Sequence, residues 1–348
     1  MKISHFLTAA TVLSSVAAGP ALARDEVRIV GSSTVFPYAQ RVVDAFASTG
    51  KHPAPTLAST GTGSGITAFC AGVGADTPDI ANASRAMTLA EYQACRENGV
   101  GDITKVRIGY DGLSVAHSKD APVAWALSLR DLYAALAKTV PSEGGFAPNP
   151  AKVWSDVNPD LPDTPIKVYG PPPSSGTRDS FAELAMEKGC NAFPAIAALE
   201  ASDTDRWTAI CTELRTDGAY IEGSEDDEEI VKALAEDPEA LGIFGYAYLY
   251  HNDAVLRGAS VAGVTPSFVT ISTGDYPLSR PLFFYIKNAH RQDIPSLNAF
   301  IAEYVSADAI SPYGYMAEEG MTPILDDQER EQTAGEAIDG VPMQVPAD

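Results

Sequence analysis

The chain has 348 residues, of which 45% are hydrophobic and 20% are charged. These proportions are typical of a folded globular protein and exclude a disordered or collagen-like chain. The 46 acidic residues outnumber the 24 basic ones and leave a formal net charge of -22, which argues against binding to nucleic acid or to anionic lipid, because both need a basic surface. A chain of this length is expected to form two domains.

Residues 1–23 have the pattern of a cleavable export signal. Lys2 gives a basic start, residues 6–18 are apolar, and Ala21-Leu22-Ala23 supplies a small-x-small cleavage sequence. The apolar run is too short to span about 30 Å of hydrocarbon. No cysteine precedes Cys70, so a lipid-anchored lipoprotein is not expected. We predict cleavage after Ala23.

After the signal, β-rich runs alternate with amphipathic segments. Strands are expected at 26–30, 55–58, 79–83, 103–110, 113–117, 166–169 and 276–287, and helices at 35–47, 66 onward, 88–98, 128–136, 177–187, 225–235 and 295–305. Thr88 with Glu91 forms a capping box. Residues 141–150 are expected to be surface turns, and the acidic tail after Asp326 is expected to be mobile. This order predicts an α/β fold with mixed, mostly parallel sheets, in which ligands bind where strands end and helices begin.

An exported chain favours disulfides, and this chain has 4 cysteines. Of the three possible connectivities, pairing Cys70 with Cys95 and Cys190 with Cys211 keeps each bridge local. The histidines are scattered without metal-ligand spacing, so neither a metal nor a cofactor is expected.

The loops between strands and helices share one chemistry. The segments 31–34, 59–65, 83–85 and 174–178 are rich in hydroxyl residues and glycine, and two of them carry Arg85 and Arg178. Glycine permits close approach, hydroxyls donate hydrogen bonds, and helix N-termini direct N–H groups toward anions. An arginine can bind an oxyanion through two parallel hydrogen bonds. One such loop alone would be an ordinary helix cap, but together they predict a site for a tetrahedral oxyanion.

Enzyme motifs fail at these loops. Ile66 replaces the last glycine of the dinucleotide fingerprint, and Thr62 stands where a nucleophile elbow around Ser64 needs glycine. We therefore expect a binding protein and not an enzyme.

The same segments resemble the phosphate-binding receptors of bacterial high-affinity phosphate ABC transporters, the PstS type. The shared segments are GSSTVFP at 31–37, GTGSG at 61–65, DIANASR at 79–85, WSDVNP at 154–159, SGT at 175–177, LGIFGY at 241–246 and YPLSRP at 276–281. The resemblance implies a two-domain periplasmic binding protein, type II-like, with a ligand cleft between its domains. Residues 24–111 plus 266–348 would form domain 1, and 112–265 would form domain 2. Such a protein would be a periplasmic monomer that binds inorganic phosphate and delivers it to ABC permease subunits in the inner membrane.

The resemblance also implies a set of phosphate ligands. Domain 1 would supply Ser33, Thr34, Val35, Ser64 and Arg85, and domain 2 would supply Ser175, Gly176 and Thr177. Weaker candidates are Gly63, Asp111, Ser174, Arg178 and Asp179.

The chain departs from the family at two charged positions. Arg85 stands where the best-known members have aspartate, and Pro171 stands where they have arginine. Arg178 is a candidate replacement for that arginine. The alternative is that Arg178 is a solvent-exposed residue of the first helical turn, paired with Asp179 or Glu183. The carboxylate that accepts a phosphate proton, and so rejects sulfate, would be Asp111 first and Asp179 second. For Asp111 the alternative is an Asx-turn cap.

Three other functions stay open at this point. They are a receptor for another oxyanion such as sulfate or molybdate, an exported phosphatase, and a structural or adhesive surface protein.

Overall fold

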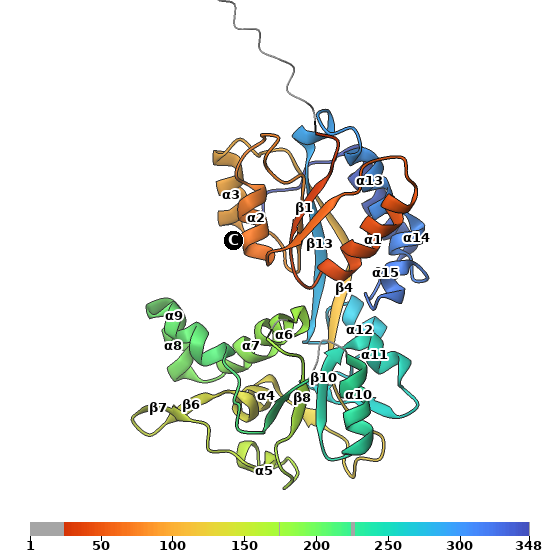
Figure 1. Ribbon diagram of the computed structural model, residues 1–348. Helices are drawn as coiled ribbons and strands as arrows, with labels where there is room; N and C mark the ends of the chain where they lie inside the picture. Colours follow the sequence, from red (N-terminus) through yellow and green to blue (C-terminus); the bar gives the residue numbers. More distant parts are fainter. Residues whose placement is uncertain (1–23, 174, 224–226, 348) are drawn as a thin grey trace, which may run out of the picture.

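The computed structural model describes residues 24–173, 175–223 and 227–347, which form two lobes (Figure 1). The predicted export signal and Ser174 lie outside the described residues. Among the helices described, none has both the length and the apolar character needed to cross a membrane. The two-lobed arrangement of helices around mixed sheets confirms the predicted α/β class.

The first lobe is built on a mixed sheet in the order β2-β1-β3-β13-β4. β1 pairs in parallel with β2 and β3, whereas β13 is antiparallel to β3 and β4. The strands are β1 (Arg28–Gly31), β2 (Thr56–Ser59), β3 (Ile80–Ala83), β4 (Ile103–Ser118) and β13 (Ser279–Lys287). The helices are α1 (Phe36–Ser48), α2 (Thr62–Phe69), α3 (Leu89–Glu97), the 3₁₀-helix η2 (Asn288–Arg291), α13 (Leu297–Tyr304), α14 (Ala307–Ile310), α15 (Tyr315–Glu318) and α16 (Asp327–Asp339).

Both faces of this sheet are covered. Apolar residues of α1 and α13 share a buried cluster with Ile80, whereas residues of α2 and α3 share a second cluster with Ala81. Successive residues of β3 thus point to opposite faces, as the pleat of a strand requires. Figure 1 shows α2 and α3 on one side of the sheet and α1 and α13 on the other.

The second lobe continues the sheet from the far end of β4. β10 is antiparallel to β4 and parallel to β8, β8 is parallel to β9, and β11 pairs with the end of β4. The strands are β5 (Ala126–Leu127), β6 (Thr139–Ser142), β7 (Gly145–Pro148), β8 (Val168–Gly170), β9 (Tyr220–Glu222), β10 (Leu241–Gly245), β11 (Leu256–Gly258) and β12 (Ser260–Val261). The helices are α4 (Leu129–Leu136), α5 (Trp154–Val157), α6 (Gly176–Phe181), the π-helix η1 (Ala182–Met186), α7 (Glu187–Cys190), α8 (Pro194–Ser202), α9 (Thr204–Thr212), α10 (Asp227–Glu236), α11 (Tyr246–His251) and α12 (Phe268–Ser272).

The strand β4 runs through both lobes without a break. It pairs with β13 up to Gly112 and with β10 from Leu113. The expected break at Asp111-Gly112 was wrong, because Gly112 serves packing and not a turn: a Cβ there would lie 2.5 Å from the Ile271 side chain. Ile271 itself belongs to the core of the second lobe, as does Leu278. We therefore propose that the chain returns to the first lobe in β13, later than the predicted boundary at 265.

Two segments expected to lack regular structure are ordered. Residues 139–148 form the β6–β7 hairpin, and the tail forms α16. The carboxylate of Asp326 caps α16 by accepting from the Glu329 N–H at 2.8 Å, and Ala337 is buried against the first lobe. Its acidic composition predicted mobility, but one small apolar face and a cap hold the helix in place.

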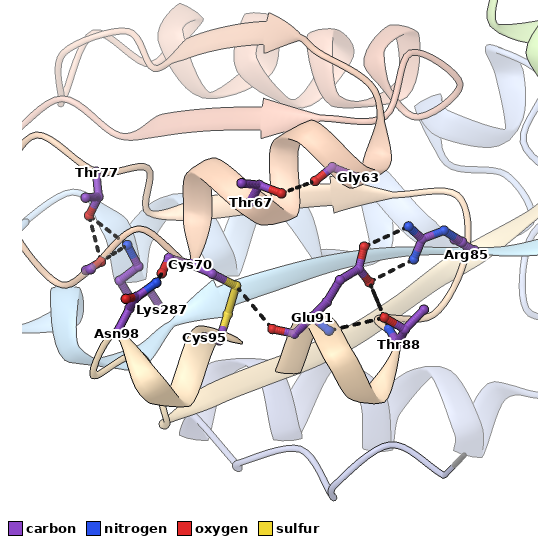
Figure 2. Close-up of a disulfide and its surroundings, with 11 residues drawn as sticks. Gly63, Thr67, Cys70, Thr77, Arg85, Thr88, Glu91, Cys95, Asn98 and Lys287 are labelled. Atoms are coloured by element: carbon purple, nitrogen blue, oxygen red, sulfur yellow. Dashed lines mark hydrogen bonds and ion pairs between the residues drawn. A yellow bond between two sulfur atoms is a disulfide. The ribbon is translucent and has the colours of Figure 1, made fainter. Parts of the chain in front are cut away.

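The disulfides join Cys70 to Cys95 and Cys190 to Cys211, which confirms the predicted pairing. The first bridge connects the end of α2 to α3 (Figure 2), and the second connects α7 to α9. Their sequence separations are 25 and 21 residues. Loops of this size stabilise a fold by about 3 kcal/mol in the chain-entropy model.

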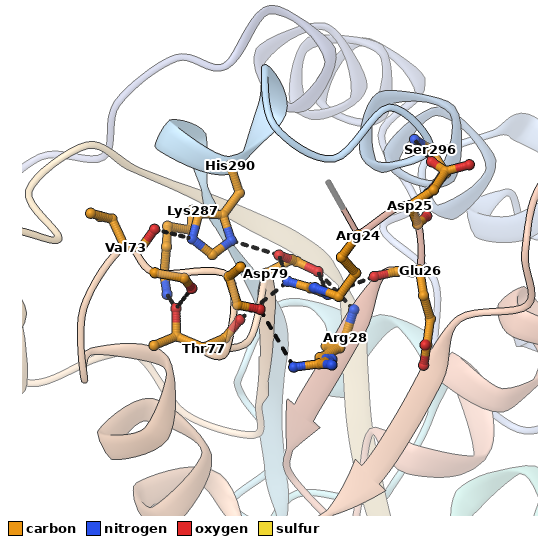
Figure 3. A network of polar contacts seen from close by, with 12 residues as sticks. Arg24, Asp25, Glu26, Arg28, Val73, Thr77, Asp79, Lys287, His290 and Ser296 are labelled. Carbon is orange, nitrogen blue, oxygen red and sulfur yellow. Dashed lines mark hydrogen bonds and ion pairs between the residues drawn. The ribbon is translucent and has the colours of Figure 1, made fainter. Parts of the chain in front are cut away.

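A buried carboxylate organises the end of the first lobe away from the second. Asp79 is 0% exposed and accepts from both guanidinium nitrogens of Arg24 at 2.8 Å and from the Arg28 N–H at 2.7 Å. The His290 ring nitrogen Nδ1 lies 2.6 Å from its other oxygen (Figure 3). Burial alone would raise the pKa of Asp79, but the hydrogen bonds from His290, Arg24 and Arg28 bring that pKa below its usual 3.8.

This network predicts an acid-sensitive stability. Because the folded pKa of Asp79 is depressed, its contribution is fully present above pH 3.8 and is lost as the pH falls below that value. We expect Asp79→Asn to lower the free energy of unfolding by about 3 kcal/mol at pH 7, since it leaves buried cations without their partner. Denaturant unfolding at pH 7 and pH 3 measures this free energy, and Asp76→Asn, at an exposed position of the same loop, is the control. An equal loss of unfolding free energy in the two variants would contradict the stabilising role of Asp79.

Candidate functional site

A cavity of about 390 Å³ lies between the lobes, where helices begin. Its walls come from the starts of α1 and α6, from β4, and from segments beside α10, α11 and α15. The lining residues are Ser33, Thr34, Phe36, Pro37, Tyr38, Ser59, Asp111, Ser175, Gly176, Thr177, Asp227, Gly245, Ala247, Tyr248, Glu319 and Gly320. The sequence-predicted residues Ser33, Thr34, Asp111, Ser175, Gly176 and Thr177 thus meet in one place.

The loop before α1 is shaped by a glycine. Gly31 has φ +130, and a Cβ there would lie 2.1 Å from the carbonyl oxygen of Asn82. Without a side chain at this point, the loop can lie against β3, and the Ser32 N–H donates to Asn82 O at 2.9 Å. This contact holds Ser33 and Thr34 just before the N-terminus of α1, facing the second lobe.

The loop before α6 touches the first lobe directly. A Cβ on Gly176 would lie 2.9 Å from the Thr34 nitrogen and 3.0 Å from the Ser33 carbonyl carbon. The Ser175 hydroxyl caps α6 by accepting from the Thr177 N–H at 3.2 Å. Within the part of the chain that the structure describes, the N–H groups of Ser33, Thr34 and Gly176 donate to no protein acceptor. Unpaired N–H groups at helix starts are a preferred environment for an oxyanion.

The buried cation in contact with the Thr34 hydroxyl is Arg280, for which no role was predicted from the sequence and which does not itself line the cavity. Its side chain is 6% exposed and comes from β13. Nη2 donates to the Thr34 hydroxyl at 2.6 Å and to the Ser180 hydroxyl, Nε lies 3.3 Å from Asp111 Oδ2, and Nη1 lies 2.5 Å from Glu183 Oε2. Arg280 therefore contacts both lobes. The only sequence signal was its place in the family segment at 276–281.

The predicted candidates Asp111 and Asp179 lie beside this arginine and the α1 loop. Asp111 is 8% exposed, and its Oδ2 also accepts from Ser180 at 3.1 Å. Asp179 Oδ2 accepts from the Ser33 hydroxyl at 3.1 Å, across the two lobes. The Glu183 that was weighed as a partner of Arg178 pairs with Arg280 instead.

The predicted ligands of the α2 side do not line the cavity. Arg85 donates to both carboxylate oxygens of Glu91 at 2.9 and 2.8 Å (Figure 2). Burial would raise the pKa of Glu91, but the hydrogen bonds from Arg85 and the Thr88 backbone lower it. Ser64 is exposed on α2, and the Gly63 carbonyl accepts from Thr67 at 2.9 Å.

Two further candidates also point elsewhere. Val35 is buried, and its N–H donates to the Ser32 hydroxyl at 3.3 Å. The Arg178 guanidinium lies 4.6 Å over the Tyr220 ring and donates to Pro171 O at 3.3 Å. It is therefore neither a cavity residue nor paired as the sequence suggested.

Other cavity residues were missed altogether. Tyr38, Ser59, Asp227, Tyr248 and Glu319 belong to no binding motif and come together only through the fold. Among the described residues, no cluster of three or more metal-ligating side chains is present. The site accordingly offers hydroxyls, backbone N–H groups, one buried arginine and carboxylates.

Comparison with known proteins identifies this architecture. A family profile described as a PBP superfamily domain matches residues 16–308. The chain belongs to the PBP superfamily. Within it, the protein SphX of Synechocystis sp. is 30% identical over 304 residues, which cover 85% of this chain and 78% of that protein.

Further members of the PBP superfamily confirm the resemblance to the PstS type. The phosphate-binding protein PstS of Staphylococcus haemolyticus is 30% identical over 288 residues, 80% of this chain and 76% of its own length. The crystal structure of a possible phosphate binding protein from Planctomyces limnophilus is 26% identical with a TM-score of 0.70, covering 91% of this chain and 98% of that one. An ABC-type phosphate transport receptor from Vibrio cholerae, 19% identical with a TM-score of 0.57 over 83% of this chain and 98% of its own, has the same fold.

The contact at Gly176 predicts the separation of the lobes. Gly176→Ala places a methyl group 2.9 Å from the Thr34 nitrogen, so the lobes must move apart. We expect a larger radius of gyration in small-angle X-ray scattering. Gly74→Ala is the matched control, because nothing lies within 4 Å of its added Cβ. Identical scattering from the two variants would show that the α1 and α6 loops are not in contact.

Proposed function

We propose that the cavity binds inorganic phosphate and that the protein is an exported receptor, acting as a monomer in the periplasm and delivering phosphate to an ABC permease. The observation that carries the proposal is Arg280, whose guanidinium reaches the Thr34 and Ser180 hydroxyls beside the unpaired N–H groups of two helix starts. The names of the relatives, phosphate-binding protein PstS among them, support the same ligand.

The donors suit a tetrahedral anion held between the lobes. Hydroxyls and N–H groups at 33–34 would bind two of its oxygens from the first lobe, and those at 175–177 would bind from the second. Arg280 would supply the positive charge through hydrogen bonds that are strengthened by its charge. Its contacts to Asp111 and Glu183 fix the guanidinium in place before the ligand arrives.

Asp111 gives a basis for rejecting sulfate. Phosphate near neutral pH carries a proton that a carboxylate can accept, whereas sulfate carries none and would face an unpaired, repelling oxygen. Asp111 lines the cavity, and among the described contacts its carboxylate uses only Oδ2. The Oδ1 atom is therefore our candidate acceptor, with Asp179 second.

Of the predicted ligands, we retain Ser33, Thr34, Ser175, Gly176 and Thr177. We assign the charge of the site to Arg280 in place of Arg85 and Arg178, which are engaged with Glu91 and Tyr220. Ser64 and Val35 would need a shift of their loops to reach the ligand.

The first test is the ligand itself. Residues 24–348 are stripped of ligand by partial unfolding and refolding, and then titrated by calorimetry with phosphate and, separately, with sulfate. We expect phosphate to bind one-to-one and sulfate not to bind. Asp111→Asn should reduce the ratio of phosphate affinity to sulfate affinity. The absence of phosphate binding in this titration would overturn the proposal. Turnover of a chromogenic phosphate ester would favour the phosphatase alternative.

The second test is the arginine. Arg280→Met removes a hydrogen-bonding cation worth about 3 kcal/mol, so phosphate affinity should fall about 100-fold. Arg178→Met serves as the control and should change affinity by about twofold or less, since its guanidinium stacks on Tyr220. If the two variants lost equal affinity, Arg280 would not be the cation of the site.

A further inference from the structure

The cavity is larger than inorganic phosphate requires. Its volume is about 390 Å³, and one water occupies about 30 Å³ of liquid, so there is room for about a dozen water-sized groups. A phosphate ion at the α1 and α6 loops would fill a fraction of this space. The remainder is lined by Tyr38, Asp227, Tyr248 and Glu319.

That remaining space is acidic. Asp111, Asp227 and Glu319 all line the cavity, and among its described lining residues there is no lysine or arginine. Arg280 donates to the Thr34 hydroxyl but does not line the cavity, and it is already shared with Asp111 and Glu183. A bare phosphate dianion would therefore face carboxylates, and like charges repel each other. A cation carried by the ligand would offset that repulsion.

Tyr38 contributes a phenol hydroxyl to this space. It is 8% exposed and lines the cavity, yet its hydroxyl makes no hydrogen bond within the described part of the chain. Burial, and then the charges of Asp111, Glu319 and Asp227, raise the pKa of Tyr38 well above its usual value. The same three carboxylates line the cavity together with Tyr38.

The carboxylates differ in how firmly they are held. Asp227 is 8% exposed at the start of α10 and accepts from the Gly245 N–H at 3.2 Å. Glu319 is 40% exposed at the cavity rim, and its only described ion pair is with Arg41 at 3.5 Å. A primary ammonium has three N–H donors and no acceptor, which matches carboxylates and a phenol oxygen.

We propose that the space around Tyr38, Asp227 and Glu319 receives a primary ammonium group attached to the bound phosphate. The protein would then bind aminoalkyl phosphate monoesters as well as inorganic phosphate, with the phosphate at the α1 and α6 loops and the ammonium at Tyr38. This inference rests on the proposed phosphate site.

The deciding experiment uses unmodified residues 24–348 and calorimetry with three probes: inorganic phosphate, O-phosphoethanolamine and ethyl phosphate. The last two differ in the ammonium group, so their affinity ratio measures its contribution. We expect O-phosphoethanolamine to bind at least tenfold more tightly than ethyl phosphate. If phosphate binds but the two esters bind equally or not at all, the inference is wrong and the receptor function stands. If phosphate does not bind, both the ammonium site and the proposed receptor function are wrong.

Variants then locate the ammonium. Glu319→Gln and Tyr38→Phe should each reduce the ratio between the two esters by at least threefold. Glu318→Gln is the matched control, since the neighbouring Glu318 is exposed and outside this cavity, and it should leave the ratio unchanged. A ratio that survives both Glu319→Gln and Tyr38→Phe would overturn the placement of the ammonium. Circular dichroism confirms that each variant is folded.

Discussion

The guanidinium of Arg280 lies at the junction of the two lobes, and the arrangement of the site depends on how it is surrounded. It contacts a carboxylate of β4, a carboxylate of the π-helix, the Thr34 hydroxyl in the loop before α1 and the Ser180 hydroxyl near the end of α6. A buried cation needs such partners, because an unpaired charge in a poorly hydrated space is strongly unfavourable. The same partners fix the direction in which its remaining hydrogen-bonding capacity points.

The surrounding fold supports this arrangement by bringing distant segments to one point. β13 pairs with β4 through the first lobe, so residue 280 lies opposite residue 111 although they are far apart in sequence. The π-helix widens the turn that follows α6, at the position of Glu183, and such irregular turns often occur at functional sites. Gly31 permits the α1 loop to lie against β3, and Gly176 permits the α6 loop to approach Ser33 and Thr34, because a side chain at either position would collide with backbone.

Several parts of the fold and of the candidate site could be predicted from the sequence, because each depends on neighbouring residues. The Gly-Ser-Ser-Thr loop, the Ser-Gly-Thr loop and the neighbouring cysteine pairs each lie within short segments. Arg280 could not be identified in this way, because its partners come from three distant elements. The contact of Arg85 could not be predicted from its loop alone: Glu91 of the predicted capping box also accepts hydrogen bonds from the Arg85 guanidinium. Two separate strands, 103–110 and 113–117, were predicted where β4 is continuous, and at Gly112 between them Ile271 fills the space of the missing side chain.

The order of the strands along the chain has a consequence for the proposed export of the protein. The second lobe, including its disulfide, is built from one continuous stretch between the middle of β4 and the segment before β13. The first lobe needs β13 to complete a sheet whose other strands lie near the N-terminus. A chain that emerges from a membrane N-terminus first therefore presents all of the second lobe before the first lobe can close. Until β13 arrives, the edges of β3 and β4 are unpaired and open to aggregation, which gives this protein an interval in which a chaperone would be most useful.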